Sequence, residues 1–136
     1  MVIPTLMYRI YQGEDPLTVW GDGSAIRDFA YSEDVAKGII LALHFGTNSE
    51  FVNLGSGKGD SIRTLVETLN SFIPFNYEFD ASESAGFSRR VTDISLARQT
   101  LGYEPATSLL DGLKKTWGWF LEHPDEHNEK KNYLKD

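Results

Sequence analysis

Three arginines are the side chains of this sequence best suited to bind an anionic ligand. Arg27 follows a turn in the stretch WGDGSAIRDF, and Arg89 and Arg90 stand together near the end of a polar loop. A guanidinium binds phosphate through a planar fork of donors, so two forks from separate segments could clamp a pyrophosphate. Arg27 could instead pair with Asp28 or a helix carboxylate while Arg89 and Arg90 are solvated, and spacing alone favours this alternative.

The loop GSGKGD, residues 55–60, stands between a short apolar run and a stretch with helical spacing. Glycines before a helix can expose backbone amides to a phosphate. The spacing here fits neither G-x-G-x-x-G nor G-x-x-x-x-G-K-[ST], the two standard nucleotide-binding patterns. We therefore interpret the loop as a structural turn, with anion binding as the less favoured alternative.

Two other patterns could carry chemistry, and each has a plainer explanation. His123 and His127 have carboxylates between them, as in some metal sites, but Pro124 interrupts the helix that would align them. The carboxylate pairs Glu33–Asp34 and Asp80–Glu83 could act as acid and base, but a helix terminus and a solvated loop explain them equally. We expect no metal site and assign no catalytic residue.

Composition limits the ligands and the surroundings of the protein. The 136 residues are 40% hydrophobic and 12% aromatic, which suits one globular domain with a core. The 20 acidic and 13 basic residues give a formal charge of −7, which argues against general binding to nucleic acid or anionic membrane. Cysteine is absent and no apolar run approaches the ~20 residues that span a bilayer, so we expect a soluble, cytoplasmic protein.

Hydrophobic spacing predicts the elements that position these residues. Helices are expected over 2–12, from a cap at Ser32 to Gly46, over 62–74, from a cap at Asp93 to 101, and over 108–121. Strands are expected over 17–20, 26–31, 51–54 and 75–79, with a short one near 91. Helix follows strand more than once, which predicts an α/β fold. The buried stripe of the second helix is expected to be Val35, Ala36, Ile39, Ile40 and Leu43.

The order of four motifs resembles that in one enzyme family. WGDGSAIRDFAYSEDVAKGI, FVNLGSGKGDSI, SRRVTDISLARQTLGYEP and a last helix with TWGWFLE are similar to the C-terminal half of extended short-chain dehydrogenase/reductases, the NAD-dependent epimerase/dehydratase family. The resemblance covers about residues 2–123 and looks strongest to the GDP-L-fucose synthases, which epimerise and reduce GDP-4-keto-6-deoxymannose with NADPH. It implies an α/β substrate-binding part without the N-terminal Rossmann cofactor-binding portion.

The resemblance also implies roles for individual side chains. Arg27 would contact the nucleotide phosphates, and Arg90, beside Arg89 and where the family often has lysine, would be a second phosphate or sugar contact. Trp20 would line the nucleotide pocket, with core packing as an equal alternative. The expected ligand is a nucleotide sugar, with a GDP-sugar favoured. Residues 1–123 would form this binding region, and residues 124–136 a charged, frayed tail.

Two features of the family are not found in this sequence. It lacks the dinucleotide-binding glycine turn, and no tyrosine is followed by lysine four positions later. We therefore expect this chain alone to bind no cofactor and to have no oxidoreductase activity, with NADP or NAD bound by a full-length parent. The strand at 51–54 would lack its neighbours, which predicts marginal stability, self-association or pairing with the missing N-terminal half. The alternative function is a noncatalytic interaction module that retains the scaffold.

Overall fold

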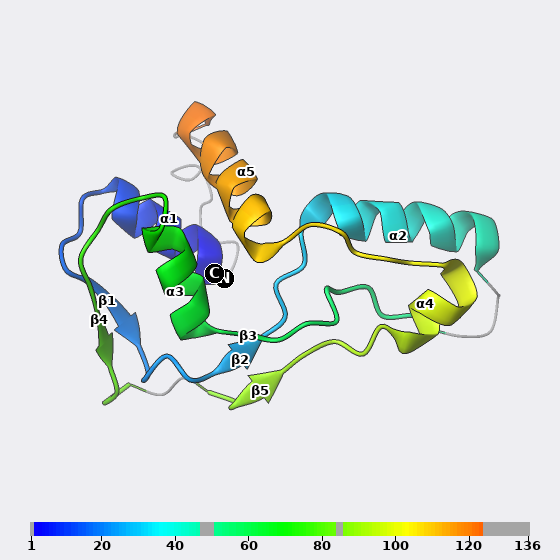
Figure 1. The fold of residues 1–136 in the computed structure, drawn as a ribbon, viewed down its shortest axis with the longest axis horizontal. Helices are drawn as coiled ribbons and strands as arrows, with labels where there is room; N and C mark the ends of the chain where they lie inside the picture. Colours follow the sequence, from blue (N-terminus) through cyan, green and yellow to red (C-terminus); the bar gives the residue numbers. More distant parts are fainter. Residues whose placement is uncertain (1, 47–50, 84–85, 124–136) are drawn as a thin grey trace, which may run out of the picture.

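The computed structural model describes residues 2–46, 51–83 and 86–123, whose helices and strands form two packed groups joined by a small sheet (Figure 1). The first group contains α1 (Val2–Tyr11), β1 (Leu17–Trp20), α3 (Ile62–Asn70), β4 (Tyr77–Asp80) and α5 (Leu109–Glu122). The second contains α2 (Ser32–Phe45) and α4 (Ser95–Leu101). The joining sheet contains β2 (Ile26–Arg27), β3 (Asp60–Ser61) and β5 (Arg89–Arg90).

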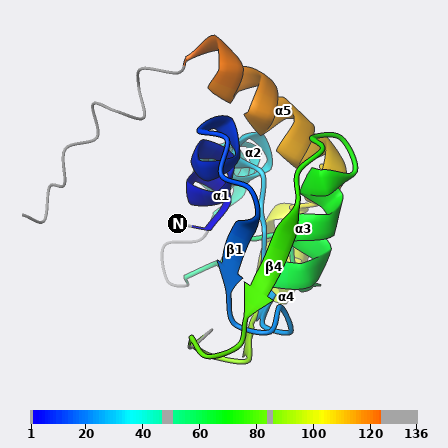
Figure 2. The same cartoon turned by 90° about the vertical axis from the view of Figure 1, so that its left-hand side faces the viewer.

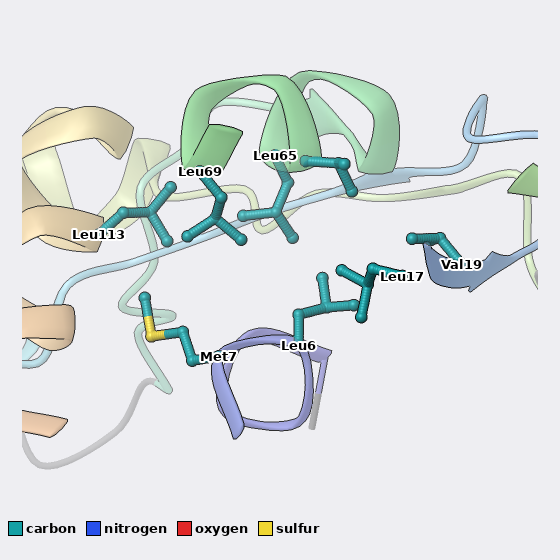
Figure 3. Close-up of a cluster of buried hydrophobic side chains, with 8 residues drawn as sticks. Leu6, Met7, Leu17, Val19, Leu65, Leu69 and Leu113 are labelled. Carbon is teal, nitrogen blue, oxygen red and sulfur yellow. The ribbon is translucent and has the colours of Figure 1, made fainter. Parts of the chain in front are cut away.

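The first hydrophobic core lies between α1 and α3 and is closed by β1 and α5. β1 and β4 run parallel, from Leu17 opposite Tyr77 to Trp20 opposite Asp80, and lie side by side in Figure 2. Figure 3 shows apolar side chains of these elements converging on one centre: Leu6, Met7, Leu17, Val19, Leu65, Leu69 and Leu113. Full burial of one such side chain contributes about 1.5–3 kcal/mol to the free energy of folding. Because the helical spacing of α1 and α3 gathers these side chains on one side of each helix, that side packs against the core.

The second core is smaller and joins α2 to α4. Its buried members are Ile94, Ala97, Leu101 and Tyr103. The Tyr103 hydroxyl donates to the Gly55 carbonyl at 2.9 Å, which gives this buried phenol a partner. Burial raises the pKa of Tyr103, so the phenol stays neutral and keeps its role as donor.

The joining sheet places Arg27 between two other segments. β2 is antiparallel to β3, with Arg27 opposite Asp60, and parallel to β5, with Arg27 opposite Arg90. The turn before β2 is closed by the Asp22 carboxylate, which accepts from the Ser24 amide at 2.8 Å. β1 and β2 belong to different sheets, so this turn is a corner between the two sheets.

Several elements match the sequence-based expectations closely. α1, β1, α3 and β4 lie within one to four residues of the predicted limits. Ser108 caps α5 by accepting from the Asp111 amide at 3.1 Å, and Gly102 ends α4 with a left-handed φ of 64°. No helix among the described residues has the length and apolarity to cross a bilayer.

Three expectations about the second group were wrong. The stripe expected to be buried on α2 is turned outward, with Ile39 52%, Ile40 55% and Leu43 81% exposed, because α2 packs through the opposite side that carries Gly38. Residues 51–54 are not a strand, since no backbone hydrogen bond joins them to another described segment. Ser32 is the first residue of α2 and does not cap it; the N-cap is Tyr31, without a side-chain hydrogen bond.

Candidate functional site

A hollow of about 800 Å³ lies beside Arg27, a volume typical of small-molecule sites. One side is formed by α1 and the other by the end of β1 and the chain from β2 towards α2. Its lining consists of residues 2–6 and 9, Val19 and Trp20, residues 27–30, and Ile62. Most of these side chains are apolar, so the few polar groups among them determine which ligand the hollow can hold.

Arg27 is a polar group that the joining sheet orients at this hollow. Its guanidinium donates to the Ile26 carbonyl at 2.8 Å and to the Phe87 carbonyl at 2.7 Å. These hydrogen bonds orient the half-buried guanidinium, and the β2–β3 pairing places Asp60 opposite Arg27. Arg27 therefore brings an oriented fork of donors, suited to a phosphate, to the hollow.

Arg90 lies next to Arg27, whereas Arg89 lies on the other face of the sheet. Arg27 and Arg90 are opposite each other in the parallel β2–β5 pair, and paired residues project to the same side. The adjacent Arg89 projects to the opposite side, where its guanidinium nitrogen approaches Gly59. The structure thus brings together two of the three arginines, and neither Arg89 nor Arg90 lines the hollow itself.

Phe87 connects the two arginines and was not foreseen from the sequence. Its carbonyl accepts from Arg27, and the Arg90 guanidinium carbon lies 4.1 Å from the centroid of its ring. A cation over an aromatic face is attracted by about 0.5–1 kcal/mol at exposed sites. One residue therefore orients both guanidinium groups on the same side of the sheet.

Trp20, at the end of β1, lines the hollow and does not pack in the core. Its side chain is 67% exposed, which excludes the core-packing alternative. An exposed indole beside a cation is suited to stack on a planar ring, because it offers a large apolar face at small cost in side-chain entropy.

Asp28, the residue after Arg27, holds the glycine loop. Its carboxylate accepts from the amides of Ser56 at 2.8 Å, Gly57 at 3.2 Å and Thr92 at 3.1 Å, and from the Ser56 hydroxyl. Partial burial opposes ionisation, but the hydrogen bonds from Ser56 and Thr92 hold the pKa of Asp28 below its ordinary value. A protein carboxylate thus already occupies the loop amides that could have bound a phosphate, as the interpretation of a structural turn predicts.

The sequence and the fold of this chain are similar to those of known proteins. The sequence profile of the NAD-dependent epimerase/dehydratase family matches residues 1–55. GDP-L-fucose synthase 1 of Arabidopsis thaliana is 34% identical over 128 residues, which are 90% of this chain and 39% of the relative. Over these spans the chain is similar to members of the NAD-dependent epimerase/dehydratase family. Its α/β fold is also that of part of this family's enzymes, as two solved structures show.

The UDP-glucose 4-epimerase of Thermotoga maritima, solved with UDP-glucose, superposes with a TM-score of 0.80 at 28% identity over 91% of this chain and 40% of that one. The Bordetella bronchiseptica enzyme WbmF, solved with NADH, gives a TM-score of 0.81 at 34% identity over 95% and 39%. The chain therefore spans about two fifths of the length of the family members it matches.

The residues described here do not fit the dinucleotide that the family name implies. A Rossmann dinucleotide site needs free amides in a glycine turn that opens a helix. In the described part of this chain, the loop before α3 has two of those amides bound to Asp28, and its last residue, Asp60, pairs with β2. No step of chemistry through a nicotinamide is therefore assigned to these residues.

The other candidate groups have structural roles. Asp80 accepts from the amide and hydroxyl of Ser82, and the Glu33 carboxylate lies 3.3 Å from the Lys115 ammonium. His123 stacks on Trp119, while His127 lies outside the described residues. Within the described ranges, no three acidic or histidine side chains are grouped to hold a metal.

Proposed function

We propose that this chain binds a nucleotide sugar, with Arg27 and Arg90 contacting the diphosphate and Trp20 contacting the base. The observation that carries the proposal is the parallel register that sets Arg27 and Arg90 side by side at the edge of an apolar hollow. Guanidinium forks from two neighbouring strands can bind the two phosphates of one pyrophosphate together. In the hollow, the apolar lining then accommodates the sugar or base.

The names of relatives support a nucleotide sugar and favour GDP over other carriers. Relatives named GDP-L-fucose synthase match 90% of this chain, and a matched epimerase was solved with UDP-glucose. We propose that the longer protein to which such a region corresponds converts a GDP-4-keto-6-deoxyhexose by epimerisation and reduction. The nicotinamide cofactor, NADP or NAD, would be bound by residues other than those of this chain.

Titration calorimetry of this chain with GDP, UDP and dTDP tests the proposal. GDP is expected to bind most tightly, and Arg27→Ala to weaken it by about 10- to 100-fold, because a hydrogen bond to a charged group contributes about 1.5–3 kcal/mol. Arg27→Lys keeps the charge but loses the fork, so it should weaken binding by less.

Arg98→Ala is the matched control for these titrations. Arg98 lies on α4 and pairs with Glu104 at 3.3 Å, away from the hollow. The Arg98→Ala variant should bind GDP with the affinity of the original chain. If no nucleotide binds, or if Arg98→Ala and Arg27→Ala lose the same affinity, the proposal is wrong and a noncatalytic interaction module becomes the better function.

Phe87 should affect the same site indirectly, as a positioning residue. Phe87→Leu keeps the carbonyl that orients Arg27 and removes only the ring beneath Arg90. We expect GDP to bind about two- to fivefold more weakly, the equivalent of an exposed cation–π contact. Phe87→Tyr keeps an aromatic ring beneath Arg90 and should bind GDP with the affinity of the original chain.

The control for Phe87 is Phe45→Leu, since Phe45 is exposed at the end of α2 and does not line the hollow. The positioning role also predicts a difference in salt dependence. Phe87→Leu should lose most of its deficit at high ionic strength, where an anion gains less from Arg90. An unchanged affinity for Phe87→Leu at low salt would contradict this role.

A further inference from the structure

The joining sheet carries a third charged side chain in line with Arg27 and Arg90. Arg27 of β2 is opposite Asp60 of β3 and opposite Arg90 of β5, so the three residues form one row across this sheet (Figure 1). Paired residues project to the same side of a sheet, which places the Asp60 carboxylate on the side of the two guanidinium groups. We call these three residues the charged row. Its neighbouring members are one strand spacing, about 4.8 Å, apart.

The Asp60 carboxylate is not paired with Arg27. The Arg27 guanidinium donates to the Ile26 carbonyl and to the Phe87 carbonyl, which lies just before β5, so its fork is held towards β5. Among the described residues, no hydrogen bond and no ion pair includes the Asp60 carboxylate, although the residue is half-buried. A carboxylate that loses solvation without gaining donors is stabilised by a ligand that brings them.

Other aspartates near the two small sheets differ from Asp60 in this respect. Each accepts from an amide of its own turn or of the glycine loop: Asp22 from Ser24, Asp28 from Ser56, Asp80 from Ser82 and Asp93 from Ser95. These four carboxylates therefore hold the chain in place. Asp60 holds no described segment through its side chain, which leaves its carboxylate available to a ligand.

Asp60 stands at the margin of the hollow. Arg27, in the middle of the charged row, lines the hollow, whereas Arg90 at the far end of the row does not. Ile62, two residues after Asp60, lines the hollow as well. A ligand group that is attached to a phosphate on Arg27 and enters the hollow therefore passes within about one strand spacing of the Asp60 carboxylate.

We propose that the Asp60 carboxylate accepts hydrogen bonds from the ribose 2′- and 3′-hydroxyls of the bound nucleotide. This inference rests on the proposed function, in which the diphosphate contacts Arg27 and Arg90 and the base contacts Trp20. Trp20 and Arg27 both line the hollow, so the ribose that joins base to diphosphate lies between them. An ionised carboxylate is acceptor-only and has two oxygens, which suits two neighbouring hydroxyl donors.

The same carboxylate makes the site selective. It repels a diphosphate, so an anion without hydroxyls binds more weakly than it would to the two arginines alone. A ribonucleotide offsets this repulsion with hydrogen bonds to a charged acceptor. Asp60 therefore favours ribonucleotides over free pyrophosphate and over deoxynucleotides, a choice that the two guanidinium groups cannot make by themselves.

Titration calorimetry of the full 136-residue chain with GDP, 2′,3′-dideoxy-GDP and inorganic pyrophosphate tests this role. The original chain should bind GDP about tenfold or more tightly than the dideoxy nucleotide. Asp60→Ala should bind these two nucleotides with equal affinity, because the acceptor of the ribose hydroxyls is lost. Pyrophosphate should bind about two- to fivefold more tightly to Asp60→Ala than to the original chain, because a repulsive charge is removed.

Glu67→Ala is the matched control, since Glu67 is an exposed carboxylate on α3 that does not line the hollow. This variant changes the net charge by the same amount and should keep the preference for GDP over the dideoxy nucleotide. Asp60→Asn keeps the size of the side chain and one acceptor oxygen but loses the charge. It should reduce the preference for GDP without abolishing it, which provides the test if Asp60→Ala does not fold.

Three results overturn the proposal. These are equal affinities of the original chain for GDP and dideoxy-GDP, a preference for GDP that survives in Asp60→Ala, and weaker binding of pyrophosphate to that variant. GDP-mannose adds the hydroxyls of a hexose: if Asp60→Ala weakens GDP-mannose and leaves GDP unchanged, the carboxylate binds the hexose and the ribose assignment is wrong.

The proposed function fails in a different way. GDP binding that is lost in Arg27→Ala but insensitive to Asp60→Ala overturns the role of Asp60 and supports the proposed function. An original chain that binds neither GDP nor pyrophosphate overturns both.

Discussion

Asp28→Ala is expected to lower the free energy of unfolding by about 3 kcal/mol. The carboxylate accepts from the amides of Ser56, Gly57 and Thr92, and alanine would leave these donors without their acceptor. A hydrogen bond to a charged group contributes about 1.5–3 kcal/mol, and water that enters the half-buried site recovers part of the loss. The effect is large because this one side chain joins β2 to the glycine loop and to the segment after β5.

Urea unfolding followed by circular dichroism measures this loss. Asp80→Ala is the matched control, since the half-buried Asp80 carboxylate accepts, within the described part of the chain, from Ser82 alone, two residues away in the same turn. Its midpoint should change much less than that of Asp28→Ala. Equal midpoints for the two variants would show that the loop does not depend on Asp28.

The same carboxylate should make stability depend on pH in the acid range. Burial raises the pKa of Asp28, but the hydrogen bonds from Ser56 and Thr92 outweigh burial and lower this pKa in the folded state. Below about pH 5 the unfolded chain therefore binds more protons at this position than the folded chain does. The contribution is complete above the ordinary pKa of about 4 and is lost as the pH falls through the lowered value. Asp28→Asn should therefore show a shallower loss of stability on acidification than the original chain.

The first group could be predicted from the sequence because its signals are local. The spacing of apolar residues in α1 and α3 and the Ser108 cap of α5 each act within a few neighbouring residues. The orientation of α2 could not be predicted in this way. Its helical spacing offers two apolar sides, and the choice between them depends on Gly38, which admits Leu54 and Tyr103 from elsewhere in the chain.

The candidate site could be predicted in composition but not in geometry. The arginine pattern and the family resemblance named Trp20, Arg27, Arg89 and Arg90, but the register of β5 decides that only Arg90 shares a side with Arg27. Phe87 and Asp28 act through contacts across about 30 to 60 residues of chain. The sequence signal for Asp28 was its position directly after Arg27, which favoured an ion pair between the two residues. In the structure the Asp28 carboxylate instead binds the amides of the glycine loop.

Gly38→Leu is expected to destabilise the protein by about 3 kcal/mol or more, because the second core has no space at this position. A Cβ on Gly38 would stand 2.7 Å from Leu54 Cδ2 and 2.9 Å from Tyr103 Cε2. Leu54 can rotate away, but Tyr103 is buried and held by its hydrogen bond to Gly55. Overpacking of this kind costs about 1–3 kcal/mol, and separating α2 from the core adds to it.

Gly118→Leu makes the same change in another helix and should have the opposite sign. Gly118 lies on the exposed side of α5, and no other segment of the described chain has an atom within 4 Å of its Cβ position. Leucine there gains about 0.5–1 kcal/mol of helix propensity over glycine. Thermal and urea unfolding of the two variants therefore separate packing from propensity. Stability retained in Gly38→Leu would mean that α2 can shift on the second core.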